Sequence, residues 1–256
     1  MIRLNEEYLQ QHVPSIYASE PEQGVSDRYK FMSTLDIMNS MEKMNYFPVS
    51  AKQDNVRVAS SEHAKHMIRF RHENVQDESG VVPEIVLINS HNRSFRFQMS
   101  MGMYRMICSN GMVVAESELM NVKTKHMNFD PIVLQEHVTE LVKNASGIYE
   151  KIDDYRNINL TGTEQQSLAK QAADLYWGKH LAIDPDRLLE SRRIEDNGSS
   201  LWKVFNVIQE NITKGGIKYK FGDRNTSTRA LNQIRKEVIF NQEIWTLMEA
   251  LRISKS

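Results

Sequence analysis

Apolar residues recur along the chain with two different periods, and the change of period predicts where helices give way to strands. Between residues 33 and 45 they recur at steps of three and four, which indicates an amphipathic helix. Ser33 or Thr34 is placed to cap its first turn, and Asn45 is placed to end it. From about residue 47 the period becomes two, as in strands whose successive side chains point to opposite faces.

The region of period two predicts an antiparallel sheet. In the segment EHAKHMIRFRH (62–72), Ile68 and Phe70 would face the core, while Arg69 and Arg71 would face solvent or a phosphate. Asn110-Gly111 is a strong turn signal, which indicates either a further hairpin or a short helix followed by a strand. The expected strands cover 47–52, 65–72, 84–89 and 94–100.

Helical periodicity dominates from Asp130 onward. Helices are expected to begin at Pro131, at a capping box of Thr163 with Gln166, at Ser199 or Ser200, and at Ser227. The whole pattern predicts an α+β fold, with an N-terminal helix and antiparallel sheet packed with a C-terminal helical half. We expect an N-terminal arm at 1–30, an α+β antiparallel-sheet domain at 31–128 and a helical region at 129–256.

Composition narrows the class of protein. The single cysteine, Cys108, excludes a disulfide within the chain, and no apolar run resembles a signal peptide or a membrane span. We therefore expect a cytoplasmic protein, with no membrane partner. Methionines cluster in 99–112, where core packing is the first interpretation and an adaptable binding surface is the alternative.

Motifs for catalysis or cofactors are weak. His63, His66 and His72 lie close in sequence, but a zinc site needs three or four converging ligands, so no metal is expected there. Glycine-rich nucleotide motifs and nucleophile motifs are missing, so we expect no cofactor, no catalytic residue and no enzyme. A metal-dependent nuclease that uses paired carboxylates stays open as a third hypothesis. The candidate carboxylates are Asp153-Asp154, Asp184/Asp186 and Glu195-Asp196.

Arginines gather on one predicted face of the sheet. Arg69, Arg71 and Arg96 alternate with core-facing residues, and Arg93 lies in the adjoining turn. A solvated sheet face explains this pattern, and so does a phosphate-binding face, because the guanidinium fork matches phosphate geometry.

A second basic group lies in residues 214–236, which carry a net charge of +6 in a chain whose formal charge is −1. Tyr219 and Phe221 alternate with lysines, an arrangement in which bases can stack while the backbone is neutralised. Nearby glycines would keep such a segment mobile until a ligand binds. A solvated basic loop is the alternative. The basic residues are Lys214, Lys218, Lys220, Arg224, Arg229, Arg235 and Lys236.

Several stretches carry a family resemblance, among them VPSIYASE, EHAKHMIRFRH, PEIVLINSHNRSFRFQMSMGMYRMICSNGMVV and GSSLWKVFNVIQENITKGG. They resemble the phage/plasmid-like family of unknown function found in prophages, plasmids and bacteriophages, over about residues 8–250. That family supplies no activity. The order of a helix and then an antiparallel meander is also similar to phage single-strand annealing proteins of the RecT, Redβ and ERF groups. This second likeness implies binding of single-stranded DNA in a basic groove and assembly into a homo-oligomer.

The sequence therefore predicts a non-enzymatic protein of a phage or mobile element that binds or anneals single-stranded DNA in recombination. The alternative is a phage or plasmid factor that acts on a host defence or replication protein. The residues expected to bind nucleic acid are Arg69, Arg71, Arg93, Arg96, Lys214, Lys218, Tyr219, Lys220, Phe221, Arg224 and Arg229.

Overall fold

The computed structural model describes residues 3–25, 29, 31–75, 80–105, 111–113, 130–143, 145–179, 181 and 183–255. The chain divides into two compact units, Met1–Ala145 and Ser146–Ser256, which we treat separately. This division falls later than the expected boundary after residue 128. The reason is that helix α3 (Pro131–Lys143) packs with the sheet and with α2 (Thr34–Lys43) of the first unit.

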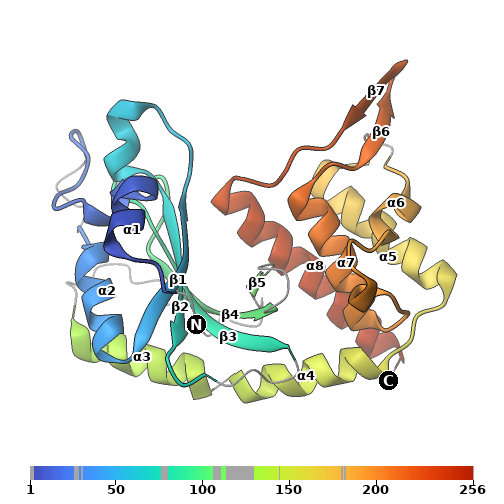
Figure 1. The fold of residues 1–256 in the computed structure, drawn as a ribbon, viewed down its shortest axis with the longest axis horizontal. Coiled ribbons are helices and arrows are strands. Elements are labelled where there is room, and N and C mark those ends of the chain that lie inside the picture. Colours follow the sequence, from blue (N-terminus) through green and yellow to red (C-terminus); the bar gives the residue numbers. More distant parts are fainter. Residues whose placement is uncertain are drawn as a thin grey trace. The chain divides into compact units, whose positions relative to one another are not determined.

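An antiparallel sheet forms the centre of the first unit (Figure 1). Its strands follow one another in chain order, as an antiparallel meander. The strands are β1 (Tyr46–Gln53), β2 (His66–His72), β3 (Val81–Asn89), β4 (Gln98–Arg105) and β5 (Gly111–Val113). A bulge between Pro48 and Ser50 shifts the β1–β2 register. The expected α+β class with an antiparallel sheet is confirmed.

Short helices surround this sheet. Ser33 caps α2 by accepting a hydrogen bond from the backbone N–H of Asp36, and the buried residues Ile37, Met38 and Met41 line the inner side of the helix. The N-terminal segment expected to be an arm instead contains two short helices whose apolar residues Leu9, Val13 and Ile16 are buried. The short helices are α1 (Glu6–His12), η1 (Pro14–Tyr17) and η2 (Val58–His63).

One sequence-based boundary in the first unit differs from the structure, and one expected turn is covered only in part. The strand expected at 94–100 begins only at Gln98, because residues 90–95 form a loop held by two hydrogen bonds between Ser90 and Phe95. The turn at Asn110-Gly111 is only partly covered, since Asn110 and Cys108 lie outside the described residues.

The second unit is built from helices around α7 (Leu201–Lys214), which is buried along almost its whole length. Ser200 caps α7, as expected. The capping box of α5 is formed by Thr161 and Glu164, two residues before the expected pair, and the last helix begins at Ile234 instead of Ser227. The other elements are α4 (Ala145–Asn157), α5 (Gly162–Trp177), α6 (Pro185–Leu189), η3 (Ile194–Asp196), β6 (Lys218–Phe221), β7 (Arg224–Ser227) and α8 (Ile234–Lys255).

The core of the second unit combines aliphatic and aromatic side chains. Tyr155 and Trp245 make an edge-to-face contact with ring centroids 5.2 Å apart, and the Tyr155 hydroxyl donates a hydrogen bond to Glu249. Burial of these large rings supplies much of the apolar area that stabilises a small helical unit. No helix within the described residues combines the length and apolar character needed to cross a lipid bilayer.

Candidate nucleic-acid interface

Arg69 and Arg71 belong to the interior of the first unit, which corrects the expectation that they face solvent or phosphate. Both pair with Glu84, which is fully buried. Arg69 Nε lies 3.1 Å from a Glu84 oxygen, and Arg71 Nε donates to the other oxygen at 2.9 Å. The Arg69 guanidinium also lies 3.9 Å from the centre of the Tyr104 ring, a cation–π contact. These two arginines are therefore not available to a polyanion.

Glu84 is the residue that sequence reasoning missed, although the strand register contains the signal. Arg69 pairs with Val86 and Phe70 pairs with Ile85, so one further step places Glu84 opposite Arg71. Opposite charges at facing positions of an antiparallel pair attract each other. Both faces of β2 and β3 are largely buried, so these central strands lack the solvent-exposed face that the sequence predicted.

Arg93 and Arg96 lie in and just after the loop between β3 and β4, where both are exposed. Arg93 has a left-handed backbone with φ of 62°, which the tight loop geometry imposes. Neither arginine makes an ion pair with any residue that the structure describes. They remain candidates for anion contact on the first unit, separate from the second basic group.

The basic segment of the second unit forms a β-hairpin, which we call the basic hairpin (Lys218–Ser227). It projects from the helices (Figure 1), and no other described helix or strand packs extensively against it. Gly222, with φ of 58°, occupies the first central position of its two-residue turn, as a type II′ hairpin requires. An ordered hairpin thus stands where a mobile loop was expected.

The register of the hairpin sorts its side chains onto two faces. Lys218 and Lys220 face one way, opposite Ser227 and Asn225. Tyr219 and Phe221 face the other way with Arg224, which pairs directly with Phe221 at the tip. The Phe221 side chain is 68% exposed, an unusual situation for a large apolar ring. One face therefore combines two lysines with the uncharged Ser227 and Asn225, and the other combines aromatic rings with a guanidinium.

Contacts at its base hold the hairpin to the helices. Gly215 lies so close to the strand returning from β7 that a Cβ there would stand 2.5 Å from the Arg229 carbonyl carbon. The Gly215 carbonyl accepts a hydrogen bond of 2.6 Å from Arg192, and Thr228 closes the base through its backbone and its hydroxyl. These contacts fix the direction in which the hairpin leaves α7.

Lys214 differs from the other cations because its charge is already neutralised. Its ammonium lies 2.6 Å from Glu210, which also binds Arg193. Burial would raise the pKa of Glu210, but the hydrogen bonds from Arg193 and Lys214 outweigh it and keep the pKa below its usual value. By contrast, six cations make no ion pair with the part of the chain that the structure describes. They are Lys218, Lys220, Arg224, Arg229, Arg235 and Lys236.

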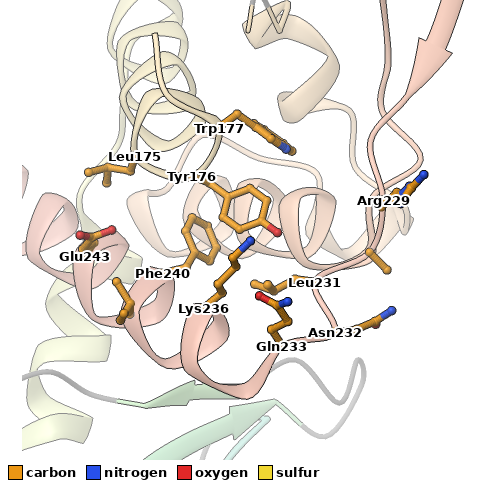
Figure 2. Close-up of a pocket in the computed structure, with 12 residues that line it drawn as sticks. Leu175, Tyr176, Trp177, Arg229, Leu231, Asn232, Gln233, Lys236, Phe240 and Glu243 are labelled. Carbon is orange, nitrogen blue, oxygen red and sulfur yellow. The ribbon is translucent and has the colours of Figure 1, made fainter. Parts of the chain in front are cut away.

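A cleft of about 620 Å³ lies beside the basic hairpin, between the C-terminal end of α5 and the N-terminal half of α8. We call it the α5–α8 cleft. Figure 2 shows the Tyr176 ring near its centre with Phe240 behind it, while Trp177 and Arg229 lie toward its edges. Burial raises the pKa of Tyr176, so its hydroxyl stays protonated and can donate a hydrogen bond. The sequence analysis did not identify Tyr176 and Trp177 as site residues, because nothing in the helical pattern of α5 marks them as surface residues.

Five of the six carboxylates proposed for a nuclease have structural partners, among them Asp186, which accepts a hydrogen bond from Gln166. Asp153 pairs with Arg156, and Asp154 lies 3.3 Å from Arg252. Asp184 caps α6, and Asp196 pairs with Arg193. In the described residues, no group of three or more histidine, cysteine or acidic side chains is arranged to hold a metal ion.

The histidines of the first unit form part of a buried polar cluster. His66 Nδ1 donates to the Ala64 carbonyl, and its Nε2 accepts a hydrogen bond of 2.9 Å from Thr34. His91 Nε2 lies 3.3 Å from the Thr34 hydroxyl, and the Asn89 side-chain amide donates a hydrogen bond to that hydroxyl oxygen. Burial lowers the pKa of His66 to about 4 and that of His91 to about 3, so both are neutral at pH 7. We assign this cluster a role in stability.

Comparison with known proteins agrees with a family whose function is unassigned. Residues 23–245 match the family described as "Domain of unknown function (DUF932)". The chain is 34% identical to the UPF0380 protein YfjQ of Escherichia coli K12 over 97% of this chain and 91% of YfjQ. It is 33% identical to the UPF0380 protein YafZ of the same organism over the same shares. No solved structure matches the chain. The chain therefore belongs to the DUF932 family of unknown function, and it is similar in sequence to the UPF0380 proteins YfjQ and YafZ.

Proposed function

We propose that this protein binds single-stranded DNA without catalysing a reaction, and that the basic hairpin of the second unit is its main contact. The observation that carries the proposal is the concentration of six cations, unpaired within the described residues, on and just after a projecting hairpin. The molecule as a whole has a formal charge of −1, so this charge is local. A local basic surface is the usual electrostatic footprint of nucleic-acid binding.

The arrangement of side chains favours a single strand over a duplex. The cationic face, with Lys218 and Lys220, can follow a phosphate backbone. The opposite face offers Phe221 and Tyr219, and base–aromatic stacking needs bases that are not already stacked within a duplex. Arg224 shares the aromatic face and can contact a phosphate or the plane of a base.

The proposal covers a smaller set of residues than the sequence predicted. Arg69, Arg71 and Lys214 are excluded because acids neutralise them. Arg93 and Arg96 stay as secondary candidates on the first unit. Four further expectations rest on the resemblance alone: annealing, recombination, self-association and an origin in a phage or mobile element. A strand-annealing assay with complementary oligonucleotides tests the annealing activity.

The alternative, a factor that acts on a host protein, has lost part of its support. Met99, Met101 and Met103 are buried, so they do not form an adaptable binding surface. Met106 and the Met112 side chain lie outside the described residues. What supports this alternative is the same exposed hairpin, which could contact an acidic protein.

A salt series tests the proposal. Each phosphate that the protein neutralises on a single strand contributes about −0.7 to the slope of log K against log salt concentration. The variant Lys218→Ala/Lys220→Ala/Arg224→Ala should therefore make the slope shallower by about 2. The matched control Lys170→Ala/Lys179→Ala/Arg187→Ala removes three exposed cations from helices and loops of the same unit, and it should leave the slope unchanged. Equal slopes for both triple variants, or no binding at low salt, would refute the proposal.

A further inference from the structure

We infer that the α5–α8 cleft binds one unstacked nucleobase of a single strand, while Arg229 and Lys236 contact the neighbouring phosphates. This inference rests on the proposed function and adds a second, base-directed site to the basic hairpin. It identifies the part of the protein that would distinguish bases from a bare phosphate chain.

The size and lining of the cleft suit a nucleotide. Its volume of about 620 Å³ lies within the range of pockets that bind small organic ligands. Tyr176 and Trp177 supply ring faces, Leu231 supplies apolar area, and the side chains of Asn232 and Gln233 are available to the polar edge of a base. Neither amide side chain makes a hydrogen bond within the described residues.

The aromatic side chains of the cleft are held in place before any ligand binds. The Tyr176 ring packs edge-to-face on Phe240, with centroids 5.4 Å apart, and on Trp177, with centroids 5.1 Å apart. Phe240 itself is buried. A ring that is already ordered loses little conformational freedom on binding, so stacking on it contributes more to affinity.

Charge complementarity points to a phosphate-bearing ligand. Arg229 and Lys236 both line the cleft, and neither makes an ion pair with the described residues. In the view of Figure 2, the Lys236 ammonium is drawn in the same central part of the cleft as the Tyr176 hydroxyl, whereas Glu243 is drawn at the opposite side with Leu175. A phosphate at the Lys236 side thus avoids the one acid of the cleft, while a base enters between the aromatic residues.

The cleft continues the path of the basic hairpin. Only Thr228 separates the last residue of β7 from Arg229, so the hairpin leads directly to a cation that lines the cleft. A strand bound to the hairpin can therefore reach the cleft with its next phosphates still neutralised. Because a paired base stays stacked in its duplex, the cleft should favour single strands and tolerate different bases.

The test compares two oligonucleotides of equal charge, a thymidine oligomer of about 20 nucleotides and an abasic deoxyribose-phosphate oligomer of the same length, a length that exceeds typical single-strand site sizes. Trp177 is the reporter, since the other two tryptophans, Trp202 and Trp245, are 6% and 1% exposed. Stacking should quench the emission of Trp177. We expect quenching with the thymidine oligomer and none with the abasic one.

Affinity provides the second readout. The wild type should bind the thymidine oligomer roughly tenfold more tightly than the abasic one, a typical contribution of one stacked base. Trp177→Leu should remove most of this ratio and leave the salt slope unchanged. The matched control is Phe221→Leu, which removes a ring from the hairpin tip and should leave the Trp177 quenching in place.

The outcomes separate the two proposals. Salt-dependent binding of both oligomers, with equal affinity and no change in Trp177 emission, would overturn the cleft and the stacking role of Tyr219 and Phe221, and would leave the phosphate contacts of the hairpin cations standing. Failure of either oligomer to bind would overturn both. The quenching experiment uses the wild type alone, so it decides the matter even if Trp177→Leu does not fold.

Discussion

Replacing Glu84 by glutamine removes the one negative charge between two buried arginines while keeping the size and shape of the side chain. Glu84 is fully buried, and the side chains of Arg69 and Arg71 are only 10% and 13% exposed. Glu84→Gln therefore leaves two guanidinium groups near each other, without a counter-charge between them and with little access to water.

The structure sets the expected magnitude. The Glu84 carboxylate accepts hydrogen bonds from Nε and Nη2 of Arg71, at 2.9 and 2.5 Å, and one of its oxygens lies 3.1 Å from Arg69 Nε. Removing one partner of a buried ion pair costs about 3–5 kcal/mol, because the remaining charge stays desolvated. A glutamine oxygen can still accept one hydrogen bond, so we expect the lower end, about 3 kcal/mol.

The assay must report on the first unit alone. Hydrogen exchange of backbone amides in β2 and β3, followed by mass spectrometry, gives the free energy of opening of those strands. Tryptophan fluorescence in urea serves as an internal control, because Trp177, Trp202 and Trp245 all belong to the second unit. Glu140→Gln, which changes an exposed carboxylate on α3, is the matched control variant.

Two results would refute the reasoning. If Glu84→Gln lowered the opening free energy of β2 and β3 no more than Glu140→Gln does, the buried pair would not stabilise the sheet. If Arg71→Met reduced the affinity for single-stranded DNA and its salt slope as strongly as Lys220→Ala, the arginines would bind the polyanion after all.

Three further predictions concern stability. Gly215→Ala should destabilise the second unit by about 2 kcal/mol or more, since its Cβ would collide with the Arg229 backbone at a φ of 65°; thermal unfolding followed by tryptophan fluorescence checks this, with Gly162→Ala as a tolerated control. The unfolded chain binds a proton at His66 more readily than the native one, so stability should be present above pH 6.5 and lost as the pH falls toward about 4. Between pH 7 and pH 5 this one group should cost about 2 kcal/mol, and urea unfolding at both pH values, compared with His66→Gln, would show no such difference if the histidine were already charged. Thr161→Ala removes the N-cap of α5 and should cost about 1 kcal/mol, measurable as a lower urea midpoint than that of Thr246→Ala on the surface of α8.

Local patterns in the sequence predicted much of the fold. The helix capped by Ser33, the strand over 66–72 and the helix between Ser200 and Gly215 were all expected, because caps, periodicity and glycine stops act over a few residues. Errors arose where two local signals competed. Thr163 with Gln166 resembles a capping box as closely as Thr161 with Glu164 does, and only the chain path into α5 distinguishes them.

The candidate site shows the same division between what the sequence by itself determined and what only the tertiary structure decided. The sequence determined that residues 214–236 are basic and contain aromatic residues, because charge and side-chain type do not depend on the fold. The tertiary structure decided which cations are available: it placed Glu84 against Arg69 and Arg71 and Glu210 against Lys214, and it left the hairpin cations unpaired within the described chain. It also brought Tyr176 to the same cleft as Lys236, 60 residues later in the chain. The physical reason is that ion pairing and burial depend on distances of a few ångströms between residues far apart in sequence, and only packing sets those distances.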